Sequence, residues 1–389
     1  MHEARFVTKE VSRFPNDDDL ALNKRQVMKS WLSVLLIFST YNLHVSAQNS
    51  VGDSTMVSLT IQLHTGRILP HSSSIAELTH ERLWGVQSDI SRMRLTQASW
   101  NTCNCYSHNG ISISYFNFNN EQELGAAYSL AVFAEPELVH GRMNVGLRAG
   151  AGISYLTRVY DPVDNPRNLF FSNPWSGLLL MQISGRYHLD PQWVIRLAAS
   201  YHHISNGGQK QPNKGMNFPA LSLGVEHRSG YRPLLRRTKN ISTDHAMHYY
   251  AGLSYNTRSV DESNFSSRSR EMVIGIHAGF YRPIARMHGV GAGIELFHDN
   301  ALKAQARQQS QSFDHRVASI LVRHDFLFGR FDFSQALGFY LYKEYSTPDR
   351  VFQRYVLQYL LVKGLQIGFS LKAHLDTAEQ MDIRIGVIF

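Results

Sequence analysis

Residues 201–217 hold the residue types in this chain that could do chemistry. They read Tyr-His-His-Ile-Ser-Asn-Gly-Gly-Gln-Lys-Gln-Pro-Asn-Lys-Gly-Met-Asn. His203 and Ser205 are two residues apart, so on a strand both side chains point to one face and an imidazole can reach a hydroxyl. A Ser–His pair is the minimum for nucleophilic acyl transfer, in which the histidine takes the serine proton and the serine attacks an ester carbonyl. Asn206 and the backbone of Gly207 and Gly208 could supply hydrogen-bond donors to the oxyanion that forms.

The strand that carries His203 and Ser205 supports a functional interpretation of the pair. This context is needed because His-x-Ser alone is usually an ordinary surface pattern. Residues 193–205 alternate, and the face of His203 and Ser205 is otherwise apolar, with Trp193, Ile195, Leu197 and Tyr201. Ionisable groups at a lipid boundary are costly and mark functional sites. A hydrolase in this position would meet membrane lipid and not a soluble substrate. His202 has the opposite parity and is expected to face the interior.

The same two-residue alternation recurs through most of the chain and predicts its fold. Residues 143–155, 288–297 and 381–389 each place aliphatic side chains on one face and glycine or polar residues on the other. We therefore expect an all-β transmembrane antiparallel barrel with a lipid-facing aliphatic wall. Sixteen strands are predicted, at 55–68, 81–97, 111–118, 122–135, 141–157, 174–187, 191–205, 217–229, 246–257, 270–282, 286–298, 312–328, 330–344, 352–361, 364–375 and 380–389.

The connections between these strands predict which end of the barrel faces outside. Barrels of this class have short periplasmic turns and longer outer loops. Counting back from Phe389, the tight connections fall on the periplasmic side, and the long ones at 157–174, 205–217, 257–270 and 298–312 fall outside. The pattern breaks at 97–111 and at 229–246. One barrel of about sixteen strands is favoured, and the alternative is two tandem eight-stranded halves linked by residues 229–246.

The N-terminal region resembles an export signal. Met28-Lys29-Ser30 precedes an apolar run over 31–43, and Val45-Ser46-Ala47 forms a small-x-small cleavage site before Gln48. This run is too short for a spanning helix, which needs about 20 residues. We expect an upstream extension at 1–27, a signal peptide at 28–47 and an outer-membrane barrel at 48–389.

Composition and charge limit the classes of molecule that the chain is expected to bind. The net charge of +8 is scattered without a basic block, which favours an anionic surface over nucleic acid. Two cysteines exclude a disulfide scaffold, and no zinc-binding spacing is present, so neither metal nor cofactor is expected. Four loop cations could bind phosphate groups of a lipid headgroup, with simple solvated charges as the alternative: Arg158, Arg167, Lys210 and Lys214.

At His203–Asn217 the sequence resembles a known family, the outer-membrane lipid A deacylases (lipid A 3-O-deacylase, often called acyloxyacyl hydrolase). The shared pattern is His-x-Ser-Asn, a glycine, then Lys-Gln-Pro-Asn-x-Gly, and a weaker resemblance covers about residues 55–229, the eight strands of the family's barrel. The resemblance implies Ser205 as nucleophile and His203 as general base, with Asn206 and the Gly208 amide as oxyanion-hole donors. It also implies lipid A or lipopolysaccharide of the outer leaflet as substrate. The strands at 246–389 are similar to those of longer relatives from Bacteroidetes-type bacteria.

One residue departs from the family pattern. The third member of the family's triad is a glutamate, and the matching position here is Asn217. An asparagine can orient a histidine, but it cannot stabilise an imidazolium by charge. Glu226 lies on the same predicted strand with the opposite parity, so it is expected to face the lumen below the site.

Two other functions remain open from the sequence. Sixteen strands in one barrel would enclose a lumen wide enough for water, so a passive channel is one alternative. A catalytically silent structural barrel that keeps the family loop without turnover is the other.

Overall fold

The structure is a computed structural model. It describes residues 54–139, 141–207, 210–230, 245–260, 269–308, 310–312, 314–344, 350–374 and 377–389. The predicted upstream extension and signal peptide lie outside the described residues, as does Gly208 in the candidate site.

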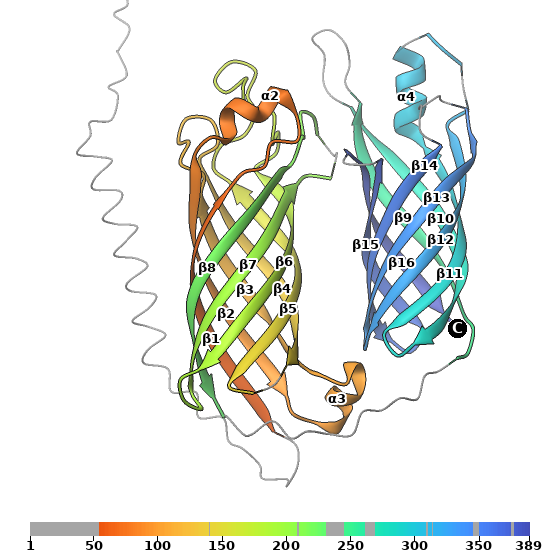
Figure 1. Cartoon of the computed structure of the whole chain (residues 1–389). Coiled ribbons are helices and arrows are strands. Elements are labelled where there is room, and N and C mark those ends of the chain that lie inside the picture. Colours follow the sequence, from red (N-terminus) through yellow and green to blue (C-terminus); the bar gives the residue numbers. More distant parts are fainter. Residues whose placement is uncertain are drawn as a thin grey trace, which may run out of the picture. The chain divides into compact units, whose positions relative to one another are not determined.

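The first eight strands form one closed antiparallel barrel, labelled in Figure 1. Each strand pairs with the next in the chain, and the last pairs with the first over a register that runs from Val57↔Ser229 to Gly66↔Ala220. The barrel therefore has no open edge, as a membrane-embedded sheet requires. Its strands are β1 (Thr55–Arg67), β2 (Arg82–Arg94), β3 (Tyr106–Asn117), β4 (Ala126–Val139), β5 (Met143–Leu156), β6 (Trp175–His188), β7 (Trp193–Ser205) and β8 (Met216–Ser229).

The remaining eight strands form a second closed barrel. Its first and last strands pair from Ile383↔Tyr255 to Ile388↔Tyr250. Its strands are β9 (His248–Val260), β10 (Ser269–Ala285), β11 (His288–Asp299), β12 (Arg316–Phe328), β13 (Phe331–Lys343), β14 (Val351–Val362), β15 (Leu365–His374) and β16 (Thr377–Ile388).

The predicted fold class is confirmed and the favoured closure is wrong. All sixteen predicted strands are present and antiparallel, but they close as two barrels of eight, which was the alternative prediction. The reason is that β8 pairs with β1 and not with β9, so the long 229–246 connection joins two self-contained sheets. The wide lumen on which the channel alternative depended is consequently absent from both described barrels, because eight strands leave an interior that side chains can fill.

The described residues include three α-helices and one 3-10 helix that were not predicted from the sequence. They are α2 (Ser73–Ala76), η1 (Glu77–Thr79), α3 (Gln97–Cys103) and α4 (Asn300–Gln308). Helix α3 explains why the turn pattern breaks at 97–111: Thr96 caps it by accepting the Ser99 N–H at 3.0 Å, and β3 then begins at Tyr106, earlier than predicted. Cys103, the last residue of this helix, forms a disulfide with Cys105. None of the described helices is long and apolar enough to span a membrane.

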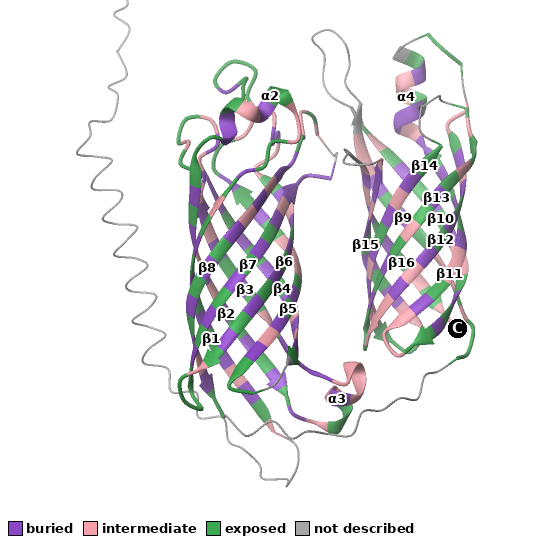
Figure 2. Ribbon diagram, viewed as in Figure 1, coloured by how far each residue is buried: buried purple, intermediate pink, exposed green. Residues whose placement is uncertain are grey.

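The outward wall of each barrel is apolar, as the alternation predicts. Burial switches at nearly every residue along the strands, which gives the striped ribbons of Figure 2. In the first barrel, aromatic side chains gather on the outward face near one end of the strands, which is typical of a membrane interface: Trp84, Tyr115, Tyr128, Tyr155, Trp175 and Tyr201. That end, at which the 68–81, 118–125, 157–174 and 206–215 connections lie, is called the outer end below.

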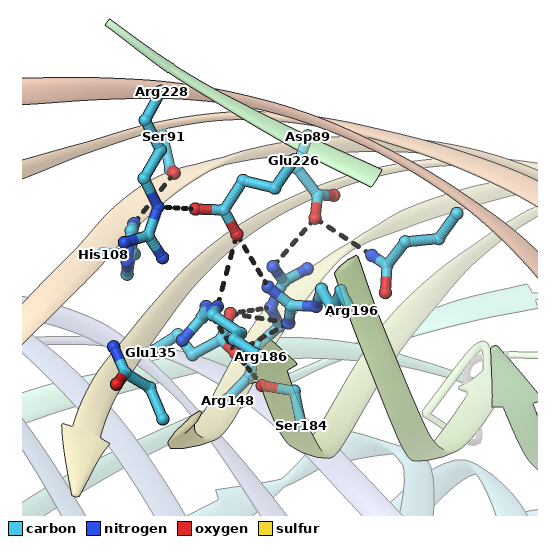
Figure 3. Close-up of polar contacts among 12 residues, drawn as sticks. Asp89, Ser91, His108, Glu135, Arg148, Ser184, Arg186, Arg196, Glu226 and Arg228 are labelled. Atoms are coloured by element: carbon cyan, nitrogen blue, oxygen red, sulfur yellow. Dashed lines mark hydrogen bonds and ion pairs between the residues drawn. The ribbon is translucent and has the colours of Figure 1, made fainter. Parts of the chain in front are cut away.

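The interior of the first barrel is filled in layers. Close to the outer end lies an apolar cluster that includes Phe116, Phe118, Phe170, Phe171 and Phe218. Below it lies a buried ion-pair network, which Figure 3 shows without Glu137: Arg148, Arg186, Arg196 and Arg228 with Asp89, Glu135, Glu137 and Glu226. Glu135 is its centre: Arg148, Arg186 and Arg196 approach its oxygens to 2.8, 2.8 and 2.6 Å. Because buried charges must be paired, this balance is what allows an ionic interior.

Candidate active site

The candidate site lies where β7 passes into its loop at the outer end of the first barrel. Residues 206–215, called the site loop here, connect β7 to β8. Alternation along β7 places His203 on the outward side of the wall with Tyr201, while His202 is buried in the lumen and stacks on Phe218 with ring centroids 4.7 Å apart. The expectation that His202 faces the interior is therefore confirmed.

His203 and Asn217 are direct neighbours across the β7–β8 ladder. The Nδ1 of His203 donates to the amide Oδ1 of Asn217 at 2.6 Å. Because an amide oxygen only accepts, Nδ1 carries the proton and the lone pair is on Nε2. This is the tautomer that a general base needs, and the asparagine sets it without contributing charge.

Ser205 ends β7 with its hydroxyl held by two donors. The backbone N–H of Gly207 donates to Oγ at 3.1 Å, and Nδ2 of Asn213 donates to it at 3.0 Å. Both bonds use lone pairs of the hydroxyl, so its own hydrogen remains to be donated. Within the described residues, Ser205 and His203 do not hydrogen-bond each other; bonds of a catalytic pair commonly shorten only when substrate is in place.

Gly215 is the surface against which both side chains lie. A Cβ at this position would come within 3.3 Å of Cε1 of His203 and 3.4 Å of Cβ of Ser205. Its φ of +69° is also one that side chains rarely adopt. Only a glycine here lets the imidazole and the serine share this space, so the chain brings the predicted pair together around one backbone atom.

The predicted oxyanion-hole residues are placed less directly. The side-chain Nδ2 of Asn206 donates to the carbonyl of Lys210 at 2.8 Å and to Oγ of Ser172 at 3.3 Å, so both its N–H bonds hold the loop frame. Its role as an oxyanion donor stays a prediction, and Gly208 lies outside the described residues. The donors that contact the serine oxygen are Gly207 and Asn213.

Asn213 and the frame of the site loop were missed by the sequence analysis. Asn213 belongs to the Lys-Gln-Pro-Asn-x-Gly pattern, but its contact with Ser205 could be seen only in three dimensions. The frame consists of backbone bonds from distant segments: Gly215 donates to the carbonyl of Phe170 at 3.1 Å, and Leu69 donates to that of Asn217 at 2.8 Å. These partners come from other loops, and no local signal points to them.

The four predicted phosphate-binding cations are all near the outer end, but they differ in surroundings. Lys210 and Lys214 belong to the site loop, and Arg158 is exposed just after β5. Arg167 is engaged with two carboxylates from neighbouring loops, at 3.0 Å to Glu77 and 3.3 Å to Glu123. Asp161 adds a carboxylate to the same loops: the backbone N–H groups of Asp164 and Val163 bind it and lower its pKa below the ordinary value.

Other serine–histidine contacts exist, but they lie inside the barrels. Ser91 Oγ is 3.4 Å from Nδ1 of His108, whose Nε2 is 3.1 Å from Glu137, and all three are buried in the lumen of the first barrel (Figure 3 shows the first two). Ser254 is 3.1 Å from His277 in the second barrel. Glu226 is likewise in the lumen, bound to Arg228 at 2.6 Å, as predicted. Residue types and distances alone therefore do not single out a site. What distinguishes the candidate pair is that His203 lies half-buried on the outward side of the wall, whereas Ser205 beside it is buried, at 8% exposure.

No group of three or more His, Cys, Asp or Glu side chains suited to a metal ion is found in the part of the chain that the structure describes.

The chain matches two sequence models of protein families. That of lipid A 3-O-deacylase (PagL) matches residues 91–226, and that of the acyloxyacyl hydrolase C-terminal domain matches residues 243–389. The first range contains β7, the site loop and Asn217. No curated protein sequence matches the chain.

Several solved structures of outer-membrane proteins are similar to parts of the chain. Neisserial surface protein A is 15% identical over 45% of this chain and 98% of its own, with a TM-score of 0.31. The outer membrane enzyme PagL is 14% identical over 42% of this chain and 97% of its own, with a TM-score of 0.30. The Acinetobacter baumannii outer membrane protein Omp33 is 8% identical over 86% and 98%, with a TM-score of 0.16.

The two family matches follow one another along the chain, and together they cover more than two thirds of it. Each range falls on one of the two barrels. The protein is therefore an outer-membrane β-barrel protein whose first barrel matches the lipid A 3-O-deacylase family over residues 91–226 and whose second barrel matches the C-terminal domain of the acyloxyacyl hydrolases over residues 243–389.

Proposed function

We propose that this protein is a serine esterase that hydrolyses an ester-linked acyl chain of lipid A, with Ser205 as nucleophile and His203 as general base. The observation that carries the proposal is the outward position of His203, its Nδ1 bound to Asn217 and its ring packed beside Ser205 at Gly215. An anchored lipid ester can approach this wall from the outer leaflet without leaving the membrane.

The reaction follows from the protons and lone pairs at the site. As Oγ of Ser205 bonds to the ester carbonyl carbon, its proton passes to Nε2 of His203, and the carbonyl oxygen becomes the oxyanion. The intermediate collapses by breaking the bond to the sugar oxygen, which takes the proton from Nε2. Water then attacks the acyl-serine, gives a proton to the same nitrogen, and the fatty acid leaves as Ser205 is reprotonated.

Hydrogen-bond donors near Ser205 support the charged steps. The Gly207 N–H and the Asn213 amide already bind Oγ, so they favour the oxygen as its proton departs. As in the family pattern, we assign the Gly208 N–H and the Asn206 amide to the carbonyl oxygen; Asn206 would do this by exchanging its longer bond, to Oγ of Ser172, for the oxyanion. Asn217 orients His203 but adds no negative charge, so we expect a slow enzyme.

Lipid A phosphates are the groups that the loop cations would bind. Lys210, Lys214 and Arg158 are the candidates, because Arg167 already binds Glu77 and Glu123. A phosphate held at the site loop would place the acylated sugar beside Ser205 and its acyl chains along the apolar wall.

The test is acyl release from lipopolysaccharide by the purified protein in lipid vesicles, with mass spectrometry of both the free hydroxy fatty acid and the lipid A that remains. Release by the wild type that is lost in Ser205→Ala and in His203→Ala supports the proposal. Intact lipid A after prolonged incubation with the folded wild type would instead favour the catalytically silent barrel, the reading that Asn217 keeps open.

A further inference from the structure

His71 contacts the site loop from a different part of the chain. It lies in the β1–β2 connection, and its Nε2 donates to the backbone carbonyl of Lys214 at 2.9 Å. Since a carbonyl only accepts, Nε2 carries the proton and Nδ1 is the bare nitrogen. Nδ1 is buried and has no hydrogen-bond partner among the described residues, so the bond to Lys214 is the polar contact that holds the ring.

The residue that His71 holds is fixed on both sides. While its carbonyl accepts from His71, the N–H of Lys214 donates to the carbonyl of Leu169 at 3.0 Å. Gly215 follows directly, and a Cβ built on it would lie 3.3 Å from Cε1 of His203 and 3.4 Å from Cβ of Ser205, so its backbone is next to both residues. A shift of Lys214 would therefore move the backbone that lies beside the imidazole and the serine.

The same short segment also reaches the residue that orients His203. Two residues before His71, the N–H of Leu69 donates to the carbonyl of Asn217 at 2.8 Å. Residues 69–71 thus clamp the chain at 214 and at 217, on either side of the position where β8 begins.

We propose that His71 is a positioning residue of the esterase: by holding the Lys214 carbonyl, it fixes Gly215 and so sets the separation of Ser205 and His203. The inference rests on the proposed function. His71 touches neither the reacting atoms nor the nucleophile. Its effect is geometric, and displacements of about 1 Å in an active site can cost up to about 100-fold in rate.

The experiment compares His71→Ala with His71→Gln in the full-length protein. A glutamine amide offers an N–H at similar reach, so it keeps the donor and removes the imidazole. We expect kcat for acyl release to fall at least tenfold in His71→Ala with KM unchanged within twofold, and His71→Gln to retain a third or more of the wild-type kcat. His80→Ala is the matched control, since His80 is an exposed histidine of the same connection.

Hydrogen exchange gives a readout that does not need turnover. In lipid nanodiscs, peptides that cover 210–217 are expected to exchange at least tenfold faster in His71→Ala, and at the wild-type rate in His71→Gln and His80→Ala. Unchanged exchange in His71→Ala overturns the inference, and so does a kcat in His71→Gln as low as in His71→Ala. If the wild type releases no acyl chain, the proposed function fails, while the exchange rates still decide whether His71 clamps the loop.

Discussion

The two barrels share their architecture and differ in where their polar chemistry lies. Each has eight strands, and each balances its interior charge. In the first barrel, four arginines are paired with four carboxylates. In the described part of the second, six basic and six acidic side chains are joined by ion pairs: Arg258, Arg323, Lys343, Arg354, Lys372 and Arg384 with Glu295, Asp299, Asp325, Asp332, Glu379 and Asp382.

The histidine near the end of the seventh strand of each barrel shows the difference. In the first barrel, His203 lies on the outward wall and binds an amide. In the second, His374 binds the Glu379 carboxylate at 2.8 Å, but Glu379 also binds Lys372, which is 4% exposed. A register shift next to Lys372 helps to explain why Glu379 reaches these partners. An imidazole beside an acid therefore occurs inside one barrel and an imidazole beside an amide on the outward wall of the other, and the side of the wall decides what each imidazole can meet.

The largest effect is expected at the two serines that face histidines. Ser205→Ala should lower acyl release at least about 10³-fold, because it removes the nucleophile. Ser254→Ala, which removes the hydroxyl beside His277 inside the second barrel, should leave the rate within twofold. Initial rates of fatty acid release measure both. Equal losses in the two variants would mean that position on the wall does not distinguish the barrels.

The next effect concerns stability. Glu135→Gln leaves three buried arginines facing a neutral amide and should lower the free energy of unfolding of the first barrel by about 3–5 kcal/mol. Glu295→Gln, which faces Arg354 and Arg384, should do the same to the second.

Urea titrations can separate the two barrels, because four of the five tryptophans lie between residues 84 and 193 and the fifth is Trp31. Tryptophan fluorescence therefore follows the first barrel, and circular dichroism follows both. A fluorescence midpoint that moves equally in the two variants would show that the barrels unfold as one unit.

A smaller effect is expected when the first barrel receives the carboxylate that the second already has. Asn217→Glu places a negative charge beside His203. It should raise kcat/KM about tenfold, which corresponds to about 1.4 kcal/mol of transition-state stabilisation. Glu379→Gln in the second barrel should leave acyl release unchanged. An Asn217→Glu variant no faster than the wild type would identify the asparagine as the working orienter of this enzyme.

The smallest effect is expected from the loop lysines. Lys210→Ala and Lys214→Ala should each raise KM about threefold, since exposed charge contacts contribute less than about 1 kcal/mol. Both differences should shrink in high salt. Lys303→Ala, on the exposed side of α4 in the second barrel, is the control and should leave KM unchanged. A KM that rises as much in Lys303→Ala would place the substrate at both barrels.

Much of the fold could be predicted because strand alternation is local. The sixteen strands, the outward face of β7 and the lumen position of Glu226 all follow from side-chain parity. The way in which the sheets close could not be predicted. The pairing of the first and last strands depends on contacts between residues more than 150 positions apart, such as Val57↔Ser229. Short helices such as α3 were missed because seven residues, about two turns, leave little periodicity in the sequence.

The residues of the candidate site likewise fall into those that the local sequence reveals and those that only the fold brings in. His203, Ser205 and Asn217 lie within fifteen residues, so spacing and family resemblance identify them. Their support comes from elsewhere in the chain: His71 from the β1–β2 connection and Phe170 from the β5–β6 connection, both placed by the barrel. Backbone partners of this kind depend on no particular residue pattern, so only the folded structure can show them.

The pairing of β8 with β1, and of β16 with β9, bears on how such a chain can lengthen during evolution. Strands inserted into an existing sheet would widen its circumference and pull the interior arginines away from their carboxylates. An additional complete barrel leaves the diameter of the first barrel unchanged. A chain built in this way can gain or lose the whole second barrel while the first barrel keeps its diameter and its filled interior.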